Sequence, residues 1–176
     1  METAWSVFYG AVGTLGMLHG IADAFQIPYD QKMIFIWIVL SSVIWGIAFG
    51  WKRHRKYLFP AAVGLFVWIG LWRWKEICEG ICRSMERMTE AINAYYQFSW
   101  DTVQYVKTGG ISTEQTAILV AGVFVSGLLV GGFLQKKGRI LLAVLFAFGF
   151  LAPFLVGKVP ENRTVWELLI GIMGLL

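Results

Sequence analysis

Apolar stretches alternate with short polar breaks along almost the whole chain. Six such stretches cover residues 4–25, 33–51, 57–74, 116–134, 140–156 and 164–176. A helix that crosses a membrane needs about 20 mostly apolar residues, and it satisfies its own backbone hydrogen bonds, as lipid requires. The stretches lack the period-two alternation of a lipid-facing strand. The pattern predicts an all-α, polytopic membrane protein with about six transmembrane helices in one domain, residues 1–176.

The last apolar stretch is shorter than a complete membrane crossing. At about 1.5 Å per residue, a helix over residues 164–176 would reach roughly 20 Å into a hydrocarbon core about 30 Å thick. We therefore expect this helix to be truncated and the natural protein to continue after Leu176.

The segment 75–100 has a different pattern, because it is polar overall yet strongly periodic. Apolar residues recur at steps of three and four, which places them on one helical face: Cys78, Ile81, Met85, Met88, Ile92 and Tyr95. The spacing predicts one amphipathic helix outside the bilayer, with a candidate partner seam formed by Ile81, Met85, Met88, Ile92 and Tyr95. Three uses of this face stay open: packing on the chain's own bundle, lying on the outer leaflet, or binding a partner or a second copy.

Composition supports the membrane and excludes other classes. Hydrophobic residues make up 57% of the chain and charged residues 15%, whereas soluble domains have about 45–50% and 25%. The net charge of +4 could suggest nucleic acid, but the basic residues gather at the ends of apolar stretches, so no nucleic-acid partner is expected. The two cysteines, Cys78 and Cys82, lack the spacing and companions of a zinc site, so no cofactor or metal is expected.

Two short basic loops predict the orientation in the membrane. They contain Lys52, Arg53, Arg55 and Lys56 in the first loop and Lys136, Lys137 and Arg139 in the second. Short cytoplasmic loops carry an excess of Lys and Arg, and two spans separate these loops, so both can face the cytoplasm. We predict a multi-pass protein with a cytoplasmic N-terminus and with residues 75–115 on the outer side.

Few ionisable residues interrupt the apolar stretches. His19 and Asp23 are four residues apart and share a helix face, and such residues inside a membrane are functional candidates by default. Glu167 is expected in the first turn of the last helix, where the helix dipole favours a carboxylate. We favour structural roles for all three. Pro28 is expected to end the first helix, and Asp30 to cap the second.

Glycine pairs four residues apart occur in two of the stretches. Gly16 and Gly20 form one G-x-x-x-G pair, and Gly127 and Gly131 form another. Such pairs favour close helix packing, although chance pairs are expected among twenty glycines.

The order of elements resembles the N-terminal membrane region of bacterial membrane-bound transglutaminase-like proteins. The matching residues are Ile92-Asn93-Ala94-Tyr95-Tyr96, Lys136-Lys137, Phe150-Leu151-Ala152-Pro153 and Gly157-Lys158-Val159-Pro160. The resemblance implies a papain-like Cys-His-Asp domain outside the membrane, after further sequence. This chain contains no such domain, and no catalytic residue carries over to it.

These observations favour a non-catalytic integral membrane domain in a bacterial cell membrane. It would anchor or position an extracytoplasmic partner or a missing C-terminal domain, and self-association stays open. The first alternative is a small transport component resembling the substrate-binding subunit of a vitamin importer. A membrane enzyme working through His19 or Glu167 is the least favoured alternative.

Overall fold

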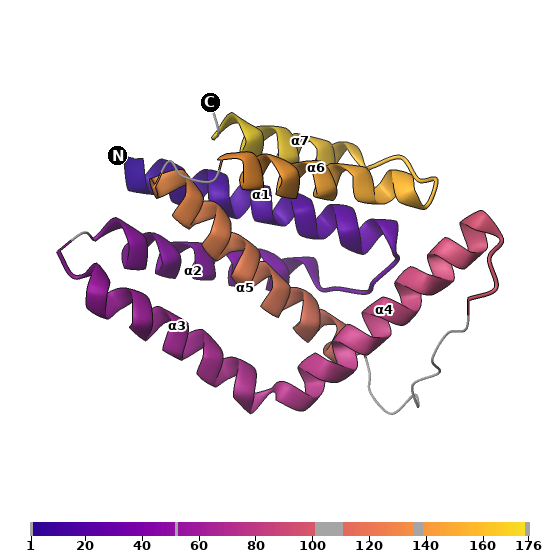
Figure 1. The fold of residues 1–176 in the computed structure, drawn as a ribbon, viewed down its shortest axis with the longest axis horizontal. Helices are drawn as coiled ribbons and strands as arrows, with labels where there is room; N and C mark the ends of the chain where they lie inside the picture. The colour runs from indigo at the N-terminus through magenta and orange to yellow at the C-terminus, as the bar shows by residue number, and fades with distance from the viewer. Residues whose placement is uncertain (1, 52, 101–110, 136–138, 175–176) are drawn as a thin grey trace.

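The computed structural model describes residues 2–51, 53–100, 111–135 and 139–174. Throughout this part of the chain the regular structure is helical, without strands, which confirms the all-α prediction. The helices are α1 (Glu2–Ala24), α2 (Gln31–Gly50), α3 (Arg55–Trp72), α4 (Trp74–Tyr96), α5 (Ile111–Gln135), α6 (Arg139–Leu155) and α7 (Asn162–Met173) (Figure 1).

Helices occur in each range in which the sequence predicts one, and local signals explain several ends. Asp30 caps α2, because its carboxylate accepts hydrogen bonds from the backbone N–H groups of Lys32 and Met33 at 2.9 and 3.3 Å. The amphipathic helix α4 ends at Tyr96, earlier than predicted, because Gln97 adopts a left-handed conformation with φ of 57°.

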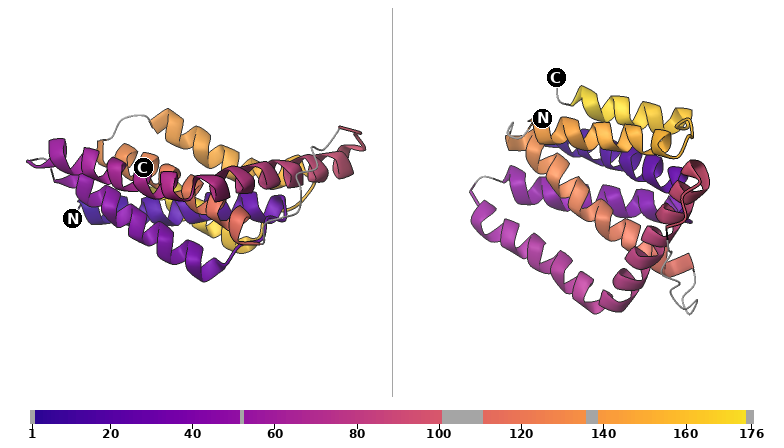
Figure 2. Two further views of the ribbon diagram at one scale, coloured as in Figure 1. Left: turned by 90° about the horizontal axis from the view of Figure 1, so that it is seen from below. Right: turned by 45° about the vertical axis from the view of Figure 1, so that its right-hand side comes forward.

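Helix α1 lies at the centre of the bundle. It packs against α2, α5, α6 and α7, which surround it in the views of Figures 1 and 2. Helix α3 is peripheral and packs chiefly against α2. Helix α4 turns away from α3 by 79°, runs obliquely across one end of the bundle and packs against α5 (Figure 1).

Small residues let the helices around α1 approach closely. A Cβ atom added at Gly16 would lie 2.9 Å from the backbone nitrogen of Leu168, and one at Gly20 would lie 2.8 Å from the carbonyl oxygen of Gly149. Both separations are too short for a real side chain. Gly16 and Gly20 therefore allow α7 and α6 to pack directly on α1, as the sequence suggested.

Some polar side chains lie among the apolar residues inside the bundle, and large apolar side chains also cover its outside. Ser41 of α2 and Ser126 of α5 are buried, and their hydroxyl oxygens lie 3.1 Å apart. The Trp45 indole donates to the Val123 carbonyl oxygen at 3.0 Å. Exposed apolar residues on α2, α3 and α6 include Phe35, Ile36, Leu40, Leu65, Trp68, Val144, Phe148 and Leu151. Contiguous apolar surface of this kind marks contact with a membrane or a protein.

Two helices are long and apolar enough to cross a membrane: α2 and the Thr113–Leu134 part of α5. The bent pair of α3 and α4 makes a third if the two form one span. The other described helices fall short of this requirement, so length and composition support two to three spans and not the predicted six. Helix α1 is not apolar enough because it contains polar residues such as Thr14 and His19. These two side chains are buried at the bundle centre and need no contact with lipid.

The two ends of the bundle differ in character. At one end α2 finishes, α3 begins and α5 finishes (Figure 1). Arg53 lies between α2 and α3 there, and Arg55 and Lys56 are the first residues of α3. At the other end α1 finishes, α2 begins, and α4 crosses the bundle (Figure 1). We call these the basic end and the α4 end. Lys52, Lys136, Lys137 and the side chain of Arg139 lie outside the described residues.

Candidate functional site

A side-chain hydrogen bond joins the central helix α1 to α7 near the α4 end. The Nδ1 atom of His19 lies 2.6 Å from Oε2 of Glu167, and the two side chains are 2% and 15% exposed. Arg163, one turn before Glu167 on α7, donates from Nε to the other carboxylate oxygen at 2.9 Å. Both oxygens of the Glu167 carboxylate therefore have a partner.

The loop between α1 and α2 extends this group of polar residues. The Tyr29 ring stacks on the His19 imidazole, with ring centres 5.6 Å apart. The Tyr29 hydroxyl donates to Oδ1 of Asp23 at 2.9 Å. Burial of the ring and its hydrogen bond to the Asp23 carboxylate raise the pKa of Tyr29, which stays protonated and keeps donating. We call His19, Asp23, Tyr29, Arg163 and Glu167 the α1–α7 polar cluster.

The hydrogen bonds of this cluster limit its chemistry. Because the Glu167 carboxylate accepts, Nδ1 of His19 carries a proton, in the arrangement by which a carboxylate orients an imidazole. The Nε2 atom is buried and has no hydrogen-bond partner among the described residues, so no hydroxyl or thiol is placed there for activation. The described residues also contain no group of three or more His, Cys, Asp or Glu able to hold a metal ion. What the cluster does directly is hold α7 against α1.

The structure brings together two of the three ionisable candidates. His19 pairs with Glu167 across helices, whereas Asp23 pairs with Tyr29. Glu167 lies in the second turn of α7, because the helix begins at Asn162, earlier than expected, so its principal partners are side chains and not the helix terminus. Sequence reasoning missed Tyr29 and Arg163. The spacing of Arg163 and Glu167, four residues apart, was the one available signal.

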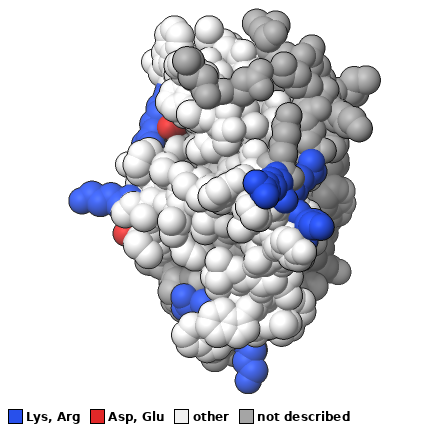
Figure 3. Space-filling model, turned by 90° about the vertical axis from the view of Figure 1, so that its left-hand side faces the viewer, with Lys and Arg blue, Asp and Glu red and all other residues white. Residues whose placement is uncertain are grey.

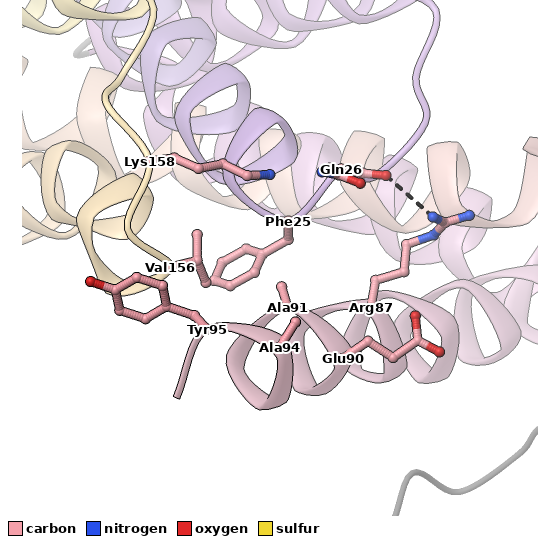
Figure 4. Close-up of a pocket in the computed structure, with 9 residues that line it drawn as sticks. All are labelled: Phe25, Gln26, Arg87, Glu90, Ala91, Ala94, Tyr95, Val156 and Lys158. Carbon is pink, nitrogen blue, oxygen red and sulfur yellow. Dashed lines mark hydrogen bonds between the residues drawn. The ribbon is translucent and has the colours of Figure 1, made fainter. Parts of the chain in front are cut away.

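A groove of about 420 Å³ opens beside this cluster at the α4 end (Figure 4). It is lined by Phe25, Gln26, Arg87, Glu90, Ala91, Ala94, Tyr95, Val156 and Lys158. These residues come from α4, from the end of α1 and from the turn between α6 and α7. The groove therefore lies where α4 meets the bundle, and not in the bundle centre.

Two basic residues that line this groove, Arg87 and Lys158, form hydrogen bonds between neighbouring elements at the α4 end. Arg87 donates from Nε to both carboxylate oxygens of Glu114 at 3.1 Å, and Glu114 is 5% exposed. Arg87 also donates to the Gln26 carbonyl oxygen at 3.3 Å (Figure 4). Lys158 donates to the carbonyl oxygen of Ala24, the last residue of α1, at 2.9 Å. A cation at a helix C-terminus is favourable, so both contacts stabilise this junction.

The predicted partner seam divides between two environments. Met88 and Ile92 pack against the buried core, whereas Ile81, Met85 and Tyr95 are 48%, 62% and 52% exposed. The division arises because the N-terminal half of α4 buries Ile77 and Gly80 instead, and Gly80 packs against Thr113 and Ala117 of α5. A glycine adds no apolar signal to a periodic pattern, so the sequence did not reveal this contact.

A second hollow lies at the basic end. It has a volume of about 570 Å³ and is lined by Arg53, Arg55, Lys56, Phe59 and Pro60. The view onto this end shows Lys and Arg side chains and little of Asp or Glu (Figure 3). The hollow thus contains three of the seven residues that predict orientation.

No protein family, curated protein or solved structure matches this chain.

Proposed function

We propose that this chain is a non-catalytic, polytopic domain of a bacterial cell membrane that positions an extracytoplasmic domain or partner. The observation that carries the proposal is the placement of α4. This helix lies across the bundle end opposite the basic end (Figure 1). Its residues Ile81 and Met85 are exposed. The partner, by the resemblance of the sequence, is a transglutaminase-like domain.

The distribution of side chains supports the membrane location. Large apolar residues face outward on α2, α3 and α6, and polar residues such as Ser41 and Ser126 lie inside. A bilayer is the environment in which this distribution is favourable. We propose that the bundle lies in the bilayer with α2 and α5 as apolar spans, while the less apolar α1 and the short α7 are surrounded partly by other helices. The basic end faces the cytoplasm, in agreement with the excess of Lys and Arg there.

The contacts of α4 support a positioning role. Ile77 and Gly80 are buried, Gly80 packs against α5, and the Arg87–Glu114 ion pair fixes the middle of the helix. The exposed residues of the seam are therefore carried on a helix whose opposite side is firmly packed. A rigid, partly apolar helix outside the bilayer is suited to bind another protein surface.

The transport alternative has less support. A transporter needs a binding site near the middle of the membrane, formed by the interior of the helix bundle. Both cavities that we describe lie at the bundle ends, and clusters of buried apolar residues such as Leu129, Phe146 and Leu168 fill the interior between them.

Site-specific photocrosslinking tests the proposed function. A photoreactive amino acid is placed at Met85 of α4, and a matched control at Val67 of α3, which is similarly exposed on the outside of the bundle. We expect Met85 to give one discrete protein product in intact membranes, which peptide mapping identifies as a transglutaminase-like domain. Val67 should react with lipid alone.

Charge substitution at the same surface completes the test. The variant I81E/M85E should lose the crosslinked product from a probe at Tyr95, while the chain remains in the membrane fraction. A seam that crosslinks to lipid alone in the unsubstituted chain would contradict the positioning role.

A further inference from the structure

Three cations surround the hollow at the basic end. Among the described residues, Arg53, Arg55 and Lys56 form no ion pair, and no acidic residue lines the hollow. Residues 51–60 contain neither Asp nor Glu. Like charges held together repel one another, so a bound anion would be stabilised here.

Aromatic rings help to hold two of these cations in place. The Arg55 guanidinium lies over the Phe49 ring, 5.5 Å from its centre, and the Lys56 ammonium lies 5.3 Å from the centre of the Tyr57 ring. Such contacts favour a defined position for each charge. The cations are therefore preorganised and need less ordering when an anion binds.

The backbone at this position also favours an anion. Helix α3 begins at Arg55, and its N-cap residue His54 makes no side-chain hydrogen bond to the helix. The first turn contains no acidic residue. The positive end of the helix dipole thus adds to the three side-chain charges. Guanidinium groups in particular match the geometry of phosphate oxygens.

The residues around the hollow favour a lipid headgroup as the source of the bound phosphate. Trp51 and Tyr57 flank the hollow with 59% and 66% of their surface exposed, as is typical of aromatic residues at the level of lipid headgroups. Beyond Phe59 and Pro60, the outer face of α3 continues with exposed Leu65 and Trp68. A ligand that has an anionic head and an apolar tail could place both parts on adjoining surfaces.

We propose that this hollow binds the phosphate group of one anionic phospholipid, with the acyl chains lying along α3. The proposal rests on the membrane location given above, because the lipid reaches the site from the surrounding leaflet. The volume of about 570 Å³ is within the range of roughly 300–1,000 Å³ typical of small-molecule sites. The site differs from general attraction of basic loops to a charged surface in one respect: it saturates at one lipid per chain.

Native mass spectrometry of the full chain in detergent provides the test. Phosphatidylglycerol and phosphatidylcholine are titrated separately, and bound lipids are counted. We expect one phosphatidylglycerol to bind with clear preference, and the variant R53Q/R55Q/K56Q to weaken this binding more than tenfold, since each basic residue near a charged headgroup contributes about a fivefold change. A matched control, K32Q/R73Q/K75Q, removes the same charge at the α4 end and should bind within about twofold of the unsubstituted chain.

The results separate a lipid site from net-charge attraction and from a site for soluble phosphate. Equal loss in both triple variants would show attraction by net charge alone and overturn the proposal. Displacement of the lipid by millimolar inorganic phosphate would assign the hollow to a soluble phosphate and overturn the lipid source. A chain that does not fractionate with membranes would contradict the proposed function, whereas a membrane-embedded chain whose R53Q/R55Q/K56Q variant still binds phosphatidylglycerol would contradict this inference alone.

Discussion

Replacing His19 by leucine is expected to lower the free energy of unfolding by about 3 kcal/mol. Leucine fills a similar volume between α1 and α7, but it cannot form the hydrogen bond that His19 forms with Glu167. The carboxylate, 15% exposed, would then depend on Arg163 alone. Removal of the hydrogen-bond donor of a buried carboxylate is costly because the remaining charge is poorly solvated. Unfolding by denaturing detergent, followed by circular dichroism, measures the change.

Two further variants separate the His19–Glu167 hydrogen bond from simple packing. In H19L/E167L both polar groups are absent, so much of the stability should return, and a double-mutant cycle should give a favourable coupling energy. R163Q should cost less than about 1 kcal/mol, because the Arg163 side chain is 45% exposed. Unchanged stability of H19L would show that the pair does not hold α7 against α1.

Replacing Gly80 by alanine is expected to separate α4 from α5 and to cost about 2–3 kcal/mol. A Cβ atom at Gly80 would collide with the carbonyl oxygen of Thr113 and would lie 2.9 Å from the Cβ of Ala117. Backbone atoms cannot move aside as a flexible side chain can, so the helices must shift. The Arg87–Glu114 ion pair, two turns further along α4, should weaken with them.

Gly70→Ala is the matched control for this substitution. Gly70 lies within α3, and a Cβ atom there would meet nothing within 4 Å. Alanine is the better helix former by about 1 kcal/mol, so this variant should be unchanged or slightly more stable. Hydrogen exchange of the α4 amides should rise in G80A alone. Equal behaviour of the two variants would contradict the close contact between α4 and α5.

The positions of the helices could be predicted from the sequence to a large extent. Long apolar runs, the cap at Asp30 and the periodicity of α4 are local signals, and helices formed where these signals occur. The number of membrane crossings is harder to predict from hydropathy. A central helix such as α1 is covered by its neighbours and can carry His19 and Thr14, so its composition does not report contact with lipid.

The candidate site was less predictable than the fold. The pairing of His19 with Glu167 joins residues 148 positions apart, and no local pattern specifies such a contact. Local spacing instead suggests that His19 and Asp23 belong together, whereas Tyr29 takes Asp23 as its partner. The role of Gly80 was equally hidden, because close approach of two backbones depends on the absence of a side chain.

The central claim is that α4 and the basic end lie on opposite sides of a membrane, and cysteine accessibility tests it most directly. In a C78S/C82S background, single cysteines replace Glu79 on the exposed side of α4 or Arg55 at the basic end. Intact bacterial cells are treated with a membrane-impermeant maleimide. We predict that the cysteine at position 79 is labelled in intact cells and the one at position 55 only after permeabilisation. Labelling of both positions in intact cells, or of neither until permeabilisation, would contradict the claim.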